Sequence, residues 1–118
     1  DEKGKGYIDF SSQLMCSNLG HKNKAIIEAI INQAEKLPYI APGFANEASI
    51  QAVEVLRSIM PEGLDKFFFS TSGTEANEAA LKLARRYMRK VRGEDRFEFV
   101  CADHSFHGRT WASISATG

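Results

Sequence analysis

Apolar residues recur every three or four positions along three stretches of this chain, a spacing that predicts amphipathic helices. The stretches cover residues 23–37, 47–60 and 75–91. Asn46 precedes the second stretch, and asparagine is a favoured residue at a helix start. Gly93 follows the third, and glycine commonly closes a helix. We therefore expect three helices with bounds close to these.

Two short apolar runs of strand length flank the third helix, at Lys66–Ser70 and Phe97–Ala102, and Tyr7–Phe10 alternates like a third short strand. Strand, helix and strand in this order predict a βαβ unit with a right-handed crossover. The expected fold class is therefore α/β. Two polar loops, Ser70–Thr74 and Asp103–Thr110, follow the strands. Because ligands of open α/β sheets bind beyond the carboxyl ends of strands, we expect both loops to border one crevice.

The turn that opens the third helix is small and polar, and it contains Ser72, Gly73 and Thr74. The first N–H groups of a helix have no partner inside the helix and lie at the positive end of its dipole. Glycine lets a ligand approach the main chain closely. This combination predicts a phosphate-binding turn. The alternative is a capping box, in which Ser72 and Glu75 satisfy these N–H groups as in helices of every kind.

The composition argues against a membrane protein, a secreted protein and a metal-binding protein. With 118 residues, a net charge of zero and 43% hydrophobic residues, the chain can form one modest core. It contains no apolar run long enough for a membrane span and no signal-peptide pattern. Cys16 and Cys101 lie far apart without a Cys/His cluster, which argues against a metal site and favours a reducing, cytoplasmic setting. We expect neither a metal nor a membrane partner.

Basic residues gather toward the end of the third helix, at Arg85, Arg86, Arg89, Lys90 and Arg92. A nucleic-acid patch is one interpretation. We favour a solvated face that complements the negative end of the helix dipole, just as Glu75 and Glu78 complement its start. We therefore expect no nucleic-acid partner.

Three stretches of the sequence resemble signatures of one enzyme family. They read YIDFSSQLMCSNLGH from Tyr7, STSGTEANEAALKLAR from Ser70 and HSFHGRTWASISATG from His104. In content and order they are similar to class III (omega-amino-acid) aminotransferases, which use pyridoxal 5'-phosphate (PLP). The resemblance covers nearly the whole chain. It implies PLP-dependent transferase fold type I, with this chain supplying an N-terminal segment and the start of the mostly parallel large-domain sheet.

The resemblance also implies roles for single residues. The turn at 72–74 would hold the PLP phosphate, and Phe106 would stack on the pyridine ring. His107 would belong to the same cofactor-binding loop. Arg109 matches an arginine that, in the acetylornithine-type branch, lies at the substrate carboxylate, where a guanidinium pairs well. Core packing for Phe106 and a structural ion pair for Arg109 are the alternatives.

By the same resemblance, the chain is expected to be the N-terminal portion of a longer polypeptide. Residues 1–45 would form an N-terminal segment and interface loop, and residues 46–118 the incomplete beginning of the large PLP-binding domain. The Schiff-base lysine is expected downstream of Gly118, so no catalytic residue is assigned within this chain. Alone, the chain should bind PLP poorly and be inactive. The complete enzyme is expected to be a homodimer.

The function implied is transfer of an amino group from an omega-amino acid or another amine donor to a 2-oxo acid. The sequence does not define the donor. Another PLP enzyme of this fold type (an aminomutase, decarboxylase or racemase) is an alternative, as is a non-catalytic phosphate-binding module. The chain lacks the G-K-[ST] and G-x-G-x-x-G patterns of nucleotide sites. It also lacks the G-x-S-x-G pattern that a hydrolase built around His107 would need.

Overall fold

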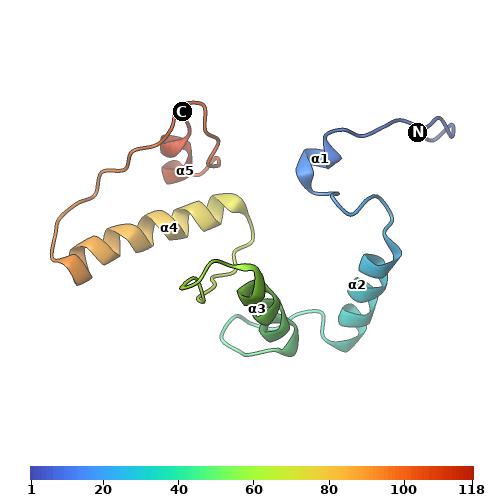
Figure 1. Cartoon of the computed structure of the whole chain (residues 1–118), viewed down its shortest axis with the longest axis horizontal. Helices are drawn as coiled ribbons and strands as arrows, with labels where there is room; N and C mark the ends of the chain where they lie inside the picture. The colour runs from blue at the N-terminus through green and yellow to red at the C-terminus, as the bar shows by residue number, and fades with distance from the viewer. The chain divides into compact units, whose positions relative to one another are not determined.

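The computed structural model describes residues 1–118. Its helical elements, labelled in Figure 1, are α1 (Ser12–Met15), α2 (Lys24–Lys36), α3 (Glu47–Ile59), α4 (Gly73–Tyr87), the π-helical turn η1 (Met88–Arg92) and α5 (Trp111–Ala116). The chain divides into two units, Asp1–Glu54 and Val55–Gly118. No helix combines the length and the apolar character that crossing a lipid bilayer requires.

The starts of α2 and α3 follow from the residues that precede them. The Asn23 side-chain oxygen accepts hydrogen bonds from the N–H groups of Ala25 at 3.1 Å and Ile26 at 3.4 Å. The Asn46 side chain accepts the Ser49 N–H at 2.9 Å. These bonds satisfy donors that a helix start leaves without partners. Both helices predicted from the periodicity are confirmed.

The segment before α2 is a hydrogen-bonded turn. All four residues of α1 have positive φ values, so the turn is left-handed, which is uncommon for residues other than glycine. Just before it, the Asp9 carboxylate accepts hydrogen bonds from the side chains of Gln13 at 3.0 Å and Ser11 at 2.9 Å. These two bonds are the main reason that the pKa of Asp9 is lowered to about 2.

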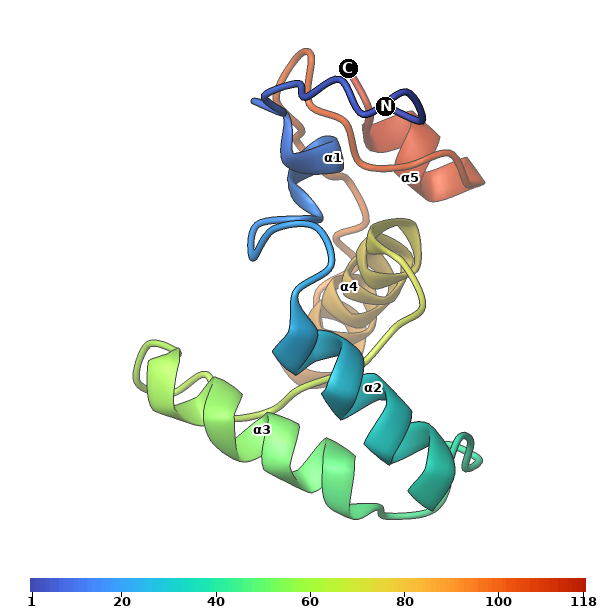
Figure 2. The same ribbon diagram turned by 90° about the vertical axis from the view of Figure 1, so that its right-hand side faces the viewer.

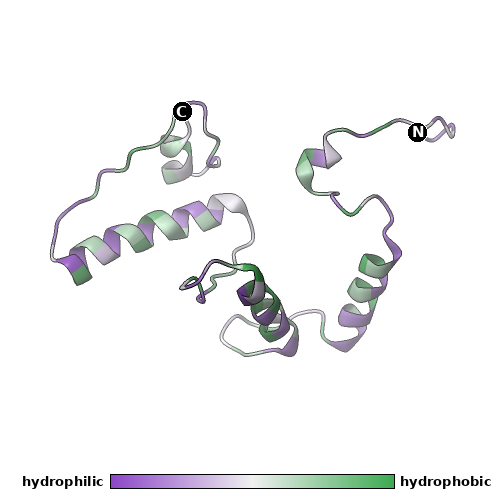
Figure 3. Ribbon diagram, in the orientation of Figure 1, coloured by the Kyte–Doolittle hydropathy of each residue, from purple (hydrophilic) through white to green (hydrophobic).

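Large apolar side chains of α2 and α3 are exposed. Along both helices in Figure 3, hydrophobic positions alternate with hydrophilic ones at helical spacing. Ile30 on α2 is 63% exposed and Ile59 on α3 is 70% exposed. The amphipathic pattern has therefore formed helices on which many apolar side chains are exposed.

The third predicted helix is confirmed, and so is its end at Gly93. α4 runs without interruption into η1, in which the hydrogen bonds widen to the π pattern. Gly93 then ends the helix at φ 68°, and its N–H donates to the Met88 carbonyl. Glycine adopts this left-handed conformation without the steric cost that a side chain imposes.

No β-strand forms, so the strands predicted at Tyr7–Phe10, Lys66–Ser70 and Phe97–Ala102 and the βαβ unit built from them are not present in this structure. A strand is defined by hydrogen bonds to a neighbouring strand. None of the three segments has such a neighbour. Their apolar side chains are consequently open to solvent: Phe68 is 77% exposed. The local pattern of a strand is present, but its pairing partners are absent.

α5 is a helix that the apolar periodicity did not predict. After η1 the chain returns as an extended segment, and α5 packs beside the first turns of α4, as Figures 1 and 2 show. The chain's three buried residues, Gly108, Ser113 and Ala116, all belong to this returning segment. The core of the second unit is therefore the contact between α4 and residues 108–117.

Gly108 is the tightest point of this contact. A β-carbon added there would lie 1.5 Å from the Thr74 hydroxyl oxygen and 3.0 Å from the Ser113 β-carbon. Its φ of 133° is also one that other residues rarely adopt. At Gly73, by contrast, nothing lies within 4 Å of the corresponding position. The loop can approach α4 this closely only because Gly108 has no side chain.

We expect Gly108→Ala to lower the free energy of unfolding by about 1–3 kcal/mol, the usual cost of overpacking, with a further cost from its φ. Gly73→Ala is the matched control. Alanine has open space there and begins a helix, so stability should change by no more than about 1 kcal/mol. Urea unfolding of the ligand-free variants measures both values. Equal stabilities would contradict the close contact between loop and helix.

Candidate functional site

The start of α4 is held by an arrangement close to the capping box that was the alternative to a phosphate-binding turn. The Ser72 hydroxyl oxygen accepts the Glu75 N–H at 3.3 Å. The Glu75 carboxylate reaches back and accepts the Thr71 N–H at 2.9 Å, one residue before the usual partner in a capping box. Ser72 itself is extended, with φ −154° and ψ 164°. This alternative is therefore present at Ser72, and its return bond is shifted by one residue.

This cap leaves donors unused. The Ala76 N–H bonds to the Ser72 carbonyl, and the Glu75 N–H bonds to the Ser72 hydroxyl. The N–H groups of Gly73 and Thr74 donate to no acceptor in the chain. Because two unpaired N–H groups lie together at the positive end of a helix of 15 residues, the geometry suits an anionic oxygen. Capping and phosphate binding are thus compatible.

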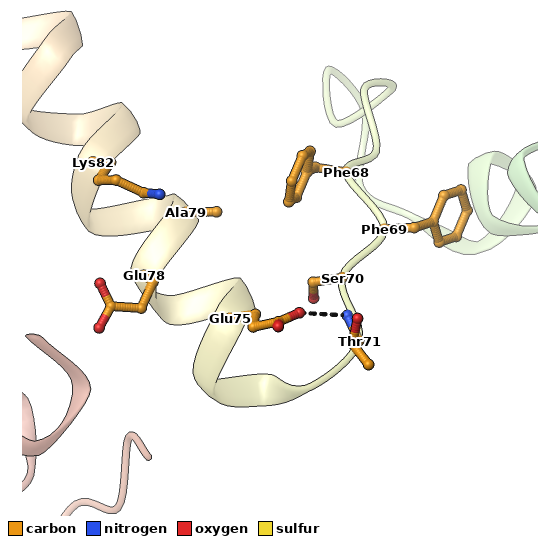
Figure 4. Close-up of a pocket in the computed structure, with 8 residues that line it drawn as sticks. All are labelled: Phe68, Phe69, Ser70, Thr71, Glu75, Glu78, Ala79 and Lys82. Carbon is orange, nitrogen blue, oxygen red and sulfur yellow. Dashed lines mark hydrogen bonds between the residues drawn. The ribbon is translucent and has the colours of Figure 1, made fainter. Parts of the chain in front are cut away.

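A hollow lies beside the same helix start, between the extended residues 68–71 and one face of α4 (Figure 4). Glu75, Glu78 and Lys82 are the charged residues that line it. In Figure 4 the Glu75 carboxylate points toward the Thr71 backbone. Two carboxylates against one ammonium do not favour an anion, so the unpaired amides, rather than this hollow, are the candidate phosphate site.

The second predicted loop carries two exposed candidates, Phe106 and Arg109, and one half-buried candidate, His107. Phe106 is 71% exposed, and the Arg109 guanidinium carbon lies 5.7 Å from the centre of its ring, within cation–π range. The half-buried His107 donates its Nδ1–H to the Ser105 carbonyl at 2.9 Å. The Nδ1–H of His107 is thus not paired with a carboxylate, as it would be in a catalytic triad. No acidic side chain pairs with Arg109.

The structure brings the two predicted loops together. The Arg109 N–H donates to the Thr74 hydroxyl oxygen at 3.1 Å, across 35 positions of sequence. The Asn77 side-chain amide donates to the His107 carbonyl at 2.6 Å. The loop that carries Phe106 and Arg109 is therefore anchored directly on the helix turn that carries the unpaired amides.

Glu78 is a residue of this site whose contacts the sequence did not reveal. Its carboxylate accepts the Thr110 hydroxyl at 2.5 Å and the N–H groups of Ala112 at 3.1 Å and Ser113 at 3.4 Å. These bonds, above all the one from Thr110, lower the pKa of Glu78. Glu78 thereby caps α5 from another helix. One sequence feature could have indicated these contacts. Thr74, Asn77 and Glu78 are spaced so that their three polar side chains lie on one face of a predicted helix.

Comparison with known proteins covers the full chain. The family model described as aminotransferase class-III matches residues 1–118. Among curated proteins, the acetylornithine aminotransferase of Ralstonia nicotianae is 45% identical over 100% of this chain and 30% of its own length. That of Aquifex aeolicus is 42% identical over 100% of this chain and 31% of its own length.

A third relative carries a broader name. The succinylornithine transaminase/acetylornithine aminotransferase of Pseudomonas aeruginosa is 36% identical over 100% of this chain and 29% of its own length. The chain thus spans about 30% of the length of the curated relatives it matches. Because the family model matches every residue, the chain belongs to the class III aminotransferase family.

Proposed function

We propose that this chain is the N-terminal portion of a PLP-dependent aminotransferase that moves an amino group from an amine donor to a 2-oxo acid. The observation that carries the proposal is the pair of unpaired amides at Gly73 and Thr74, with the loop of Phe106 anchored beside them. PLP combines a phosphate ester, which matches the unpaired amides, with an aromatic ring, which matches Phe106. Family membership supports the same cofactor.

The residues of the helix start would hold the phosphate. The N–H groups of Gly73 and Thr74 would donate to its oxygens. The Ser72 hydroxyl accepts from Glu75, and its proton stays available for a phosphate oxygen. Gly73 leaves open space in front of the main chain. When bound, PLP supplies an electron-withdrawing ring that stabilises negative charge on the substrate.

The second loop would contact the ring and the substrate. Phe106 presents a largely exposed ring that can stack on a pyridine face. Arg109 would bind a substrate carboxylate, since no carboxylate of this chain engages its guanidinium. His107 would hold the loop in shape through its bond to Ser105. The names of the relatives make acetylornithine the first donor to test.

The remaining parts of the proposal concern the complete protein. Residues 1–45 would form an N-terminal segment and interface loop of a cytoplasmic homodimer, and residues 46–118 would begin the large domain of fold type I. The extended segments at 66–70 and 97–102 would become strands once neighbouring strands pair with them. The lysine that binds PLP covalently would come from the part of the polypeptide after residue 118.

The complete protein should bind PLP and catalyse amino transfer. We expect visible absorbance from bound PLP after purification, and formation of glutamate when acetylornithine and 2-oxoglutarate are supplied together. Other amine donors, with pyruvate as a second acceptor, define the substrate range. Failure to bind PLP would refute the proposal. PLP binding with racemase, decarboxylase or aminomutase activity instead of amino transfer would retain the cofactor and refute the reaction.

Phe106→Ala in the complete protein should weaken PLP binding by roughly three- to tenfold, because ring stacking contributes about 0.5–1.5 kcal/mol. Phe106→Tyr retains a flat ring and should bind PLP nearly as tightly as the parent. Titration of the cofactor-free protein with PLP, followed by absorbance, gives both affinities. An alanine variant with the parent affinity would mean that another group contacts the ring.

Arg109→Ala should raise the KM for a donor that carries a carboxylate by about tenfold or more, with little change for an amine donor without one. Arg89→Ala is the control, since it removes an exposed guanidinium from η1. Steady-state kinetics with both kinds of donor separate the effects. An equal change for both donors would assign Arg109 a structural role.

A further inference from the structure

Three polar side chains on one face of α4 bond to the returning segment, and nearly all of their bonds are to its backbone. The Thr74 hydroxyl oxygen accepts the Arg109 N–H at 3.1 Å, and the Asn77 amide donates to the His107 carbonyl at 2.6 Å. Glu78 accepts the N–H groups at 112 and 113. These contacts fix the path of the main chain from residue 107 to residue 113.

The returning segment also bonds back to the helix. The Ser113 hydroxyl donates to the Thr74 carbonyl at 3.2 Å, and Ser113 is fully buried. The Thr117 hydroxyl accepts the His107 N–H at 3.0 Å, which closes the segment on itself. No buried side-chain nitrogen or oxygen lacks a partner. Each element thus donates hydrogen bonds to the other, and four of these bonds are part-buried, so that loss of a partner there leaves a part-buried polar group unpaired.

Within this contact, Glu78 is the residue on which α5 depends. α5 has only six residues, too few for a helix to be stable by itself in water. Thr110, at the position before α5, makes no capping bond with its side chain to the helix backbone. Glu78 supplies that cap instead, and its negative charge suits the positive end of α5. α5 therefore depends on a carboxylate from a different helix.

We propose that Thr74, Asn77 and Glu78 act as positioning residues: together they form a clasp that fixes the loop of residues 106–110 at the phosphate-binding start of α4. The clasp sets the distance between the unpaired amides of α4 and the side chains of Phe106 and Arg109. This inference rests on the proposed function, because it takes those amides and side chains as the binding groups for PLP and substrate. None of the three clasp side chains needs to touch the reacting atoms.

The first test needs no cofactor. In the cofactor-free complete protein, Glu78→Ala should speed hydrogen exchange of the backbone amides at Arg109, Ala112 and Ser113 by about tenfold or more. Glu78→Gln retains an uncharged oxygen acceptor and should give a smaller increase. Glu54→Gln removes an exposed carboxylate that forms no ion pair, and exchange should match the parent. Parent-like exchange in Glu78→Ala would refute the clasp, whether or not the protein binds PLP.

Thr74 allows a milder test by rescue. Thr74→Val keeps the shape of the side chain but loses the acceptor for the Arg109 N–H, whereas Thr74→Ser retains the hydroxyl. We expect faster exchange at residue 109 in the valine variant and recovery toward the parent rate in the serine variant. Because neither change alters charge or much volume, both variants should fold even if Glu78→Ala does not. Equal exchange in the two would refute the role of Thr74.

The second test measures positioning. If the clasp sets the geometry of the site, Glu78→Ala and Thr74→Val should weaken PLP binding by at least about tenfold, and Glu54→Gln should not. Faster exchange with parent-like PLP affinity would show that the contact exists but does not position the site. If the parent binds no PLP, the proposed function fails, and the exchange measurements still decide whether the clasp exists.

Discussion

The second unit depends on one contact, between the first turns of α4 and the backbone of residues 107–113. Gly108 makes this contact possible because it leaves no side chain between loop and helix. Hydrogen bonds between α4 side chains and backbone groups then define which loop residues lie beside which residues of α4. A contact made to backbone atoms has one geometry, whereas apolar packing alone tolerates small shifts. The proposed site inherits its geometry from this arrangement.

Hydrogen bonds to backbone N–H groups resolve an electrostatic difficulty at the start of α4. Glu75 and Glu78 bring two negative charges close to a turn that we propose binds a phosphate. Each carboxylate is engaged by backbone N–H groups, Glu75 at Thr71 and Glu78 at the start of α5. The amides of Gly73 and Thr74 are not used by either. The carboxylates therefore stabilise the elements around the site while the donors needed by an anion stay available.

Large apolar side chains are exposed elsewhere in the chain. α2 and α3 carry exposed residues such as Ile30 and Ile59, and the segments expected to be strands carry exposed aromatic side chains such as Phe68. An amphipathic helix can form through its own hydrogen bonds, because each backbone N–H bonds to a carbonyl four residues earlier in the same helix. A strand cannot, since its backbone groups require a neighbour. This difference explains why the helices are present and the strands are not.

The sequence by itself determined the three long helices, the capping role of Ser72 and the helix stop at Gly93, because those features arise from interactions over a few residues. It also identified the loop of Phe106 as one part of the candidate site. Only the tertiary structure decided that Glu78 caps α5 and that Gly108 meets Thr74. These contacts join residues more than 30 positions apart, and periodicity and capping rules contain no information on which distant segments meet.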